Sequence, residues 1–318
     1  MKVSGMTTIT VFGGGTMGEG IGLLFAMAGT MVRVVDEDGD KLNRCQSAIN
    51  KYIRQMDDHG MVKEPVLEVT HRISFYTSQF FDRAVTGAEL IIETIPESLQ
   101  MKKDLLARLD QLPADVIIAS NTGSISITQL SEEMKTPTRV IGTHFFNPAY
   151  LIPLVEVHRG ENTSHDTLEK TLTVLRAVGK IPIVLKNVMS GFIALRVVGA
   201  MMREIYHLID EGVASPAEID LAIKNSIGMK MAGFGPLEME DMAGLDIASK
   251  AYANIFPTLS NSQVPTALLS EKTDRGELGY KTGRGWLDYD QSTGSDIELK
   301  RNLRLIKQLK VLPTSEKK

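Results

Sequence analysis

A glycine-rich segment near the start of the sequence has the spacing of a phosphate-binding turn. The sequence reads ITVFGGGTMG, so a short apolar run leads directly into Gly13, Gly15 and Gly18. In such a GxGxxG pattern the first glycine makes a tight turn, the second lets the backbone approach a pyrophosphate, and the third lets the next helix pack closely. That helix, which would begin near Thr16 and Met17, presents unpaired N–H groups and its positive dipole end to the phosphates.

An acidic residue after the next apolar run indicates which dinucleotide binds. A helical stretch follows the glycines, and a second strand-like run ends at Asp36, 18 residues after Gly18. A carboxylate there can bond both ribose hydroxyls and repels a 2′-phosphate. A glycine motif alone is weak evidence, but the strand before it, the helix after it and this acid together predict dinucleotide binding, with NAD favoured over NADP.

A histidine and a glutamate on two neighbouring apolar runs could do acid–base chemistry. His144 follows the run Val140–Thr143 and precedes a turn signal at Asn147 and Pro148. Glu156 lies within a Leu-Val-Glu-Val run, where a carboxylate is costly unless it is paired. If the turn folds the two runs together, Glu156 can orient the imidazole and stabilise the imidazolium. His144 would then remove an alcohol proton while hydride leaves for nicotinamide. The spacing fits a buried structural pair equally well.

The other histidines are expected to be solvated or structural, because they lie in polar or helical stretches. They are His59, His71, His158, His165 and His207.

Alternating strand and helix patterns predict the elements that position these residues. The strand-like runs are Ile9–Phe12, Met31–Val35, Leu90–Ile92, Val116–Ser120, Val140–Thr143, Leu154–Val157 and Ile181–Leu185. Apolar strands that alternate with amphipathic helices are typical of a doubly wound parallel sheet, so we predict an α/β, Rossmann-like fold. The last runs are closely spaced, which predicts that part of the sheet is antiparallel.

The pattern changes near Asn187. Beyond this residue, apolar side chains at three- and four-residue spacing predict a long amphipathic helix, and Ser215 and Pro216 form an N-cap followed by proline at the first helical position. We therefore expect two domains, a dinucleotide-binding domain at 1–187 and an all-helical domain at 188–318.

Composition limits the class of protein. The formal net charge of −4 provides no basic surface for nucleic acid. The single cysteine, Cys45, excludes an internal disulfide and fits a reducing compartment. No apolar run approaches the roughly 20 residues that span a bilayer, and no leader-like segment is seen. We expect a cytoplasmic enzyme with a small-molecule substrate and no membrane partner.

The ordered motifs resemble the L-3-hydroxyacyl-CoA dehydrogenase (3-hydroxybutyryl-CoA dehydrogenase) family over essentially the whole chain. The matching segments are Gly13–Gly18, Glu93–Glu97, Ser120–Thr122, His144–Pro148, Leu154–Val157, Gly191–Ile193, Gly235–Glu238, Gly244–Asp246 and Lys281–Trp286. The resemblance implies a Rossmann-like domain followed by a helical domain that usually forms a homodimer. It also implies NAD as cofactor and His144 and Glu156 as the catalytic pair. The NAD contacts that it adds are Glu97, Lys102, Asn147 and Lys281. We expect no metal.

Departures from the family pattern concern the substrate pocket. The family typically reads Ser-Asn-Thr-Ser-Ser, whose first serine after threonine touches the substrate oxygen, but here that position is Gly123 and Ser124 follows it. The family also has an asparagine just before an arginine, where this chain has Leu195 before Arg196. Two polar groups that would bind the reacting oxygen are thus absent. Gly123, Ser124 and Leu195 are candidate pocket residues.

The positions that would contact CoA also differ. Relatives with CoA substrates use a serine and a lysine in the helix after the ribose-binding acid. The register here places Tyr52 and His59 there, beside Asp57 and Asp58, which are poor neighbours for a phosphorylated adenosine. The turn segment 147–154 resembles that of relatives that oxidise free 3-hydroxy acids, such as carnitine and gulonate dehydrogenases.

Three functional hypotheses follow. The first is interconversion of an L-3-hydroxyacyl substrate and its 3-oxo form, and a CoA thioester is one such substrate. The second is a dehydrogenase of a free small 3-hydroxy acid, with the NAD machinery kept and the pocket rebuilt. The third is a non-catalytic, crystallin-like protein that binds NAD.

Overall fold

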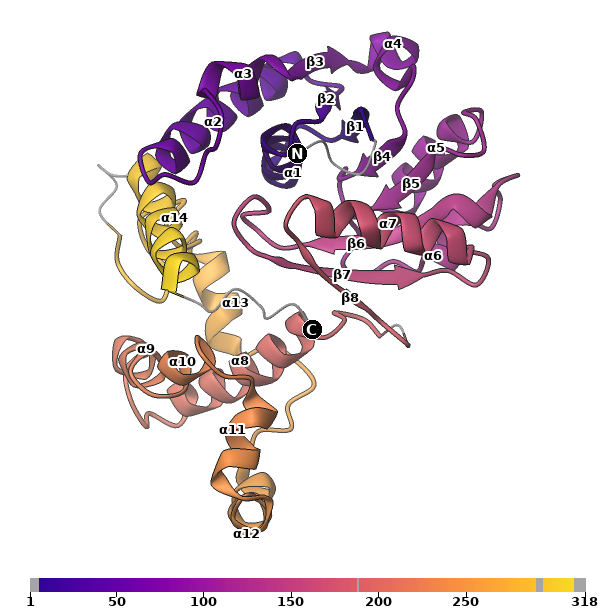
Figure 1. The fold of residues 1–318 in the computed structure, drawn as a ribbon. Helices are drawn as coiled ribbons and strands as arrows, with labels where there is room; N and C mark the ends of the chain where they lie inside the picture. Colours follow the sequence, from indigo (N-terminus) through magenta and orange to yellow (C-terminus); the bar gives the residue numbers. More distant parts are fainter. Residues whose placement is uncertain (1–5, 188, 290–293, 312–318) are drawn as a thin grey trace. The chain divides into compact units, whose positions relative to one another are not determined.

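The computed structural model describes residues 6–187, 189–289 and 294–311. Contacts between Cα atoms divide the chain into two compact units, Met1–Ile193 and Ala194–Lys318 (Figure 1). Across the described residues, no helix has both the length and the apolar character needed to cross a membrane.

The first unit is built on an eight-stranded sheet with the order β3-β2-β1-β4-β5-β6-β7-β8 (Figure 1). The strands are β1 (Thr8–Phe12), β2 (Met31–Asp36), β3 (Ile73–Thr77), β4 (Leu90–Glu93), β5 (Ile117–Ser120), β6 (Val140–Phe145), β7 (Leu154–Arg159) and β8 (Ile181–Val184). All neighbouring pairs are parallel except β6 and β7, which are antiparallel. Both the predicted Rossmann-like sheet and its antiparallel part are confirmed.

The helices of the first unit connect these strands. They are α1 (Thr16–Met27), α2 (Gly39–Asp57), α3 (Val66–His71), α4 (Phe81–Val85), α5 (Leu99–Leu109), α6 (Ile127–Ser131) and α7 (His165–Ala177). A buried core joins α5 and α6 to the sheet through Leu106, Leu130, Ile91 and Ile118. This core fixes the strand ends, where the predicted site residues lie.

One strand and one strand end differ from the sequence-based expectation. β3 was not predicted. Only its first residue, Ile73, is buried, and the other four are half-buried, so the strand lacks a continuous apolar run. β7 continues past Val157 to Arg159, and this places His158 inside the sheet. The expectation that His158 lies in a polar or helical stretch is therefore wrong.

The second unit is helical. Its helices are α8 (Ala194–Asp210), α9 (Pro216–Lys224), α10 (Ile227–Met231), α11 (Pro236–Ala243), α12 (Leu245–Ile255), α13 (Ala267–Asp274) and α14 (Gly294–Val311). The predicted helix start at Ser215 is confirmed, because the Ser215 side chain and that of Glu218 form a reciprocal capping box.

Candidate active site

The glycine turn between β1 and α1 has the geometry of a pyrophosphate cradle. Gly13 has a φ of 105°, a conformation that glycine adopts readily, and a Cβ on Gly18 would lie 1.8 Å from the Gly13 carbonyl oxygen. By contrast, a Cβ on Gly15 would meet nothing within 4 Å, so its backbone is open to a ligand. Gly15 caps α1 without a side-chain hydrogen bond, and Thr16 and Met17 form the first turn of this helix.

Asp36 borders the cavity at the end of β2. Its Oδ2 accepts a hydrogen bond from the Gly14 N–H at 2.8 Å, and Lys41 Nζ lies 3.6 Å from Oδ1. The cavity, of about 460 Å³, is lined by Asp36 together with Gly13 and Gly15 of the turn. These residues fit NAD, because the open glycine backbone suits the pyrophosphate and the carboxylate suits the ribose hydroxyls.

His144 and Glu156 form a direct pair. They are register partners on the antiparallel strands β6 and β7, and His144 Nδ1 lies 2.9 Å from Glu156 Oε2. Glu156 is fully buried, and its Oε1 accepts a hydrogen bond from the Ile193 N–H at 2.9 Å. The His144 side chain is 11% exposed. The carboxylate is therefore held on both sides, and within the described part of the chain the ring's Nε2 has no hydrogen-bond partner.

Gly123 lies beside that free nitrogen. A Cβ built on Gly123 would be 3.3 Å from His144 Nε2, which is a tight contact, so the glycine keeps side-chain atoms away from this ring nitrogen. The Ser124 hydroxyl does not fill this space, since it donates to Glu97 Oε1 at 2.8 Å. In this structure the Ser124 hydroxyl therefore does not take the place of the family serine, and its role as a pocket residue remains a prediction.

Glu97 holds the turn that contains Gly123. Its Oε1 accepts hydrogen bonds from the Thr122 hydroxyl at 2.6 Å, from the Gly123 and Ser124 N–H groups at 3.1 Å each, and from the Ser124 hydroxyl. Partial burial raises the pKa of Glu97, but the hydrogen bonds from Thr122 and Ser124 outweigh it and lower the pKa below its usual value. This side chain thus fixes the loop that faces His144.

Lys102 lies beneath this loop. Its Nζ is 2.6 Å from Glu93 Oε1, 3.2 Å from the Ile95 carbonyl oxygen and 3.4 Å from Glu97 Oε2, and the side chain is 1% exposed. Ser120 donates to the other Glu93 oxygen at 2.6 Å. The ammonium is enclosed by the protein in this structure, and a contact with NAD remains a prediction from the resemblance.

Three further residues predicted for the site lie in other segments of the chain. Asn147 is exposed in the turn between β6 and β7. Leu195 is in the first turn of α8, and Lys281 is in the loop between α13 and α14. These two belong to the second unit, and their roles remain predictions.

Two protein-family models match most of the chain. Residues 8–188 match the family described as 3-hydroxyacyl-CoA dehydrogenase, NAD binding domain, and residues 191–289 match its C-terminal domain. The chain belongs to the 3-hydroxyacyl-CoA dehydrogenase family. It is an NAD-dependent oxidoreductase, as the motifs predicted.

Individual relatives of this dehydrogenase family differ in substrate. The chain is 32% identical to a 5-formyl-3-hydroxy-2-methylpyridine 4-carboxylate 5-dehydrogenase of Mesorhizobium japonicum, over 97% of this chain and 99% of that protein. It is 35% identical to a probable 3-hydroxybutyryl-CoA dehydrogenase of Bacillus subtilis, over 90% and 98%. A crystal structure of a dehydrogenase for the pyridine substrate, an NAD-dependent dismutase, matches with a TM-score of 0.87 and 31% identity, over 95% and 97% of the chains.

Two residues close to the pair, His158 and Phe192, were not among the predicted site residues, although Phe192 lies in the Gly191–Ile193 motif. His158 is fully buried two positions beyond Glu156, and its ring lies 4.5 Å from that of Phe192. Phe192 in turn meets the His144 ring edge-on at 5.4 Å. The alternation of Glu156 and His158 along one strand was the available signal, since residues i and i+2 share a face of the sheet.

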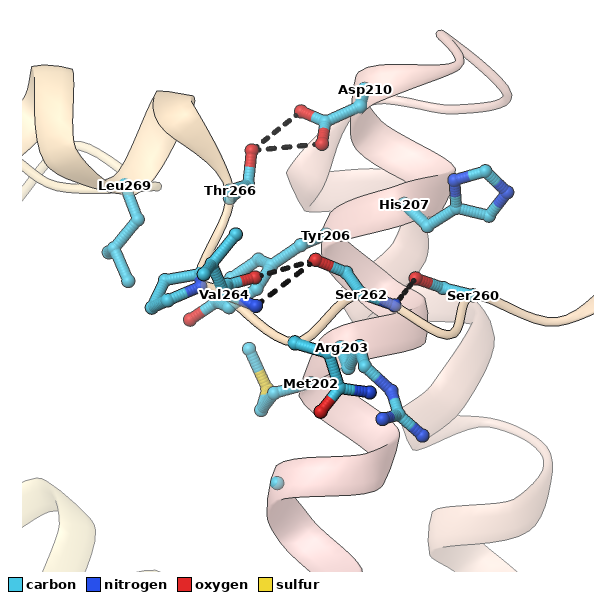
Figure 2. A pocket seen from close by; sticks show the side chains of 13 residues that line it. Met202, Arg203, Tyr206, His207, Asp210, Ser260, Ser262, Val264, Thr266 and Leu269 are labelled. Atoms are coloured by element: carbon cyan, nitrogen blue, oxygen red, sulfur yellow. Dashed lines mark hydrogen bonds between the residues drawn. The ribbon is translucent and has the colours of Figure 1, made fainter.

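The second unit of this family member contains its own cavity, of about 400 Å³ (Figure 2). It lies between α8 and the segment 260–266, where the Thr266 hydroxyl donates to both Asp210 oxygens at 2.9 and 2.8 Å. Among the described residues, none of those predicted for the site lines this cavity.

Proposed function

We propose that this dehydrogenase acts on a small free carboxylic acid that carries a hydroxyl or hydrated formyl group, with His144 as the base. The observation that carries the proposal is the missing side chain at Gly123, where a Cβ would lie 3.3 Å from His144 Nε2. A site that binds a 3-hydroxyacyl thioester through a serine would have that hydroxyl here. Removing it leaves room for a bulkier reacting group.

The pair would move one proton. When bound, NAD supplies the hydride acceptor. As the substrate C–H bond gives up its hydride and the C=O bond forms, the hydroxyl proton passes to His144 Nε2. Glu156 Oε2, 2.9 Å from Nδ1, keeps the proton on Nδ1 and stabilises the imidazolium that results. The same step run backwards reduces the carbonyl.

The region predicted to contact CoA supports a substrate without CoA. Tyr52, at the position that the resemblance assigns to a CoA-binding serine, is buried, and its ring stacks on Tyr150 at 5.3 Å. Asp57 and Asp58 are exposed one to two turns later on the chain. Tyr52 replaces the small serine side chain with a large ring whose hydroxyl lies farther from the backbone, and the exposed acids repel phosphate.

The relatives point in two directions. The pyridine dehydrogenase, which covers 97% of this chain, acts on a carboxylate with a formyl group and no CoA, according to its name. The family description and the 3-hydroxybutyryl-CoA relatives favour the second candidate, oxidation of a 3-hydroxyacyl-CoA. The missing side chain at Gly123 favours the free-acid substrate.

A substrate panel tests the proposal. Purified protein is given NAD with 3-hydroxybutyryl-CoA, 3-hydroxybutyrate, carnitine, gulonate or 5-formyl-3-hydroxy-2-methylpyridine 4-carboxylate, and NADH formation is followed by absorbance. We expect at least one free acid to exceed the thioester in kcat/KM by roughly tenfold or more, about 1.4 kcal/mol of transition-state binding. Selective turnover of the thioester would contradict the proposal, and no turnover at all would favour the non-catalytic hypothesis.

A substitution at the opening sharpens the test. Gly123→Ser restores a hydroxyl beside His144, and we expect it to lower kcat/KM for the free acid by about tenfold or more, because the new Cβ crowds Nε2. Gly123→Ala is the matched control, since it adds the same Cβ without a hydroxyl. Equal losses in both variants would assign the effect to crowding. Unchanged turnover in both would remove Gly123 from the substrate pocket.

A further inference from the structure

We propose that Phe192 is a positioning residue. Its ring packs against His158 and keeps the His144 imidazole oriented toward Glu156. The proposal rests on the proposed function of His144. It adds a role for a segment that matches the family pattern but had no assigned function. The motif is Gly191–Ile193, at the end of the first unit.

The backbone of Phe192 indicates that its position is imposed. Its φ of +49° lies in the left-handed region, and it is the one non-glycine residue with a positive φ in the described part of the chain. Side chains with a Cβ avoid this region, and such outliers persist only where the surroundings determine them. Here the Phe192 N–H donates to the Met189 carbonyl at 2.9 Å, and the ring is 4% exposed.

Two aromatic rings flank His144. The Phe192 ring meets it at 5.4 Å with an interplanar angle of 69°, and the Phe146 ring lies at 4.6 Å and 56°. Edge-to-face contact of this kind restricts rotation of the imidazole about its Cβ–Cγ bond. Since Phe146 is only half-buried, Phe192 is the more firmly fixed of the two.

His158 packs against the Phe192 ring. It pairs with Gly142 across β6 and β7, and a Cβ on Gly142 would lie 2.0 Å from His158 Cε1, so the ring rests on the glycine backbone. Neither ring nitrogen of His158 has a hydrogen-bond partner among the described residues. Burial lowers the pKa of His158 to about 4, so the ring is neutral near pH 7 and packs against Phe192 at 4.5 Å as an aromatic surface.

Glu156 contacts both His144 and the backbone next to Phe192. One of its oxygens lies 2.9 Å from His144 Nδ1, and the other accepts the N–H of Ile193, the residue after Phe192. The same carboxylate therefore orients the base and anchors the backbone that presents the phenyl ring. Loss of the ring would free His144 to rotate while its hydrogen-bond partner stays in place.

The experiment compares Phe192→Ala and Phe192→Leu with Leu172→Ala, a truncation of a buried side chain on α7. We expect Phe192→Ala to lower kcat by about tenfold to a hundredfold, with KM for NAD kept within about twofold and Phe192→Leu intermediate. Leu172→Ala should lower the melting temperature comparably and keep kcat. If Phe192→Ala and Phe192→Leu instead behave as Leu172→Ala does, Phe192 is only structural and the proposal is wrong.

A second readout needs no substrate. Nitrogen-15 NMR of ring-labelled histidine, with His144 assigned through His144→Gln, reports which ring nitrogen carries the proton. We expect one tautomer in the wild type, protonated on Nδ1, and a mixture in Phe192→Ala. An unchanged single tautomer in that variant would overturn the positioning role. If the substrate panel fails but the tautomers mix, the proposed function is wrong and the positioning role stands.

Discussion

Two buried glutamates in the first unit are each paired with a nitrogen group, and they differ in what lies beyond the pair. Glu93 and Glu156 are both fully buried, with partners Lys102 and His144 at 2.6 and 2.9 Å. The Lys102 side chain is 1% exposed, whereas that of His144 is 11% exposed and has its Nε2 beside Gly123, which has no side chain. The first pair is sealed, and the second leaves one atom free to exchange a proton.

The buried Glu93–Lys102 pair has the features of a structural ion pair. Burial raises the pKa of Glu93 even though the Lys102 ammonium opposes this, so that pair is held together in a costly environment. Among the described residues, the Glu93 carboxylate accepts its hydrogen bonds from Lys102, Ser120 and the Ile95 backbone N–H. A buried carboxylate with a sealed partner stabilises the strand ends, while one with an open partner can do catalysis.

The largest effect should come from breaking the open pair. We expect His144→Gln to lower kcat on the best substrate of the panel by about 10²- to 10⁴-fold, because the base is lost, with NADH affinity retained. Steady-state kinetics and a fluorescence titration of NADH measure the two. His165→Gln, an exposed histidine on α7, is the control and should keep wild-type turnover. Near-normal turnover of His144→Gln would remove the role assigned to it.

Breaking the sealed pair should affect folding. We expect Lys102→Met to lower the free energy of unfolding by about 3–5 kcal/mol, since it leaves Glu93 buried without its cation. Urea unfolding followed by circular dichroism measures this. The double variant Glu93→Gln with Lys102→Met should recover part of the loss, because the charge is then gone. A double variant no more stable than the single one would contradict a sealed structural pair.

His158, beside the open pair, should make folding sensitive to acid. Burial, and then the positive charge of His144, lower its pKa from 6.5 to about 4. Between these values the unfolded chain binds more protons, so the contribution is complete above pH 6.5 and is lost as pH falls towards 4. At pH 5 the loss is about 2 kcal/mol. Urea unfolding of His158→Leu between pH 7 and 5 should be flatter than that of the wild type, and an identical slope would count against a buried neutral His158.

The smallest effect is expected at the cofactor end. Asp36→Ala should reduce the preference for NAD over NADP by about tenfold, since the carboxylate no longer binds the ribose hydroxyls or repels a 2′-phosphate. The ratio of kcat/KM values for the two cofactors measures it. Asp57→Ala, an exposed acid at the end of α2, is the control. Unchanged discrimination in Asp36→Ala would show that another residue sets the preference.

Sequence patterns predicted the parts that depend on local periodicity. The glycine turn, the end of β2 at Asp36 and the antiparallel pairing of His144 with Glu156 all follow from short apolar runs and the turn signals between them. Each of these features involves neighbours in sequence or in adjacent strands, and such neighbours are fixed by the two-residue repeat of a strand.

Long-range packing explains what the sequence could not supply. Lys102 is enclosed because Glu93 and the Ile95 carbonyl meet it, and Glu97 accepts four hydrogen bonds from residues 25 to 27 positions away. His158 is buried because Gly142 on the opposing strand leaves space for its ring. None of these contacts has a local pattern.

A competition between substrates tests the central claim most directly. The wild-type protein is given NAD with an equimolar mixture of 3-hydroxybutyryl-CoA and the best free acid of the panel, and both products are quantified by mass spectrometry. The open position beside His144 predicts that the free-acid product forms faster by roughly tenfold or more. Faster formation of the 3-oxoacyl-CoA product would contradict it.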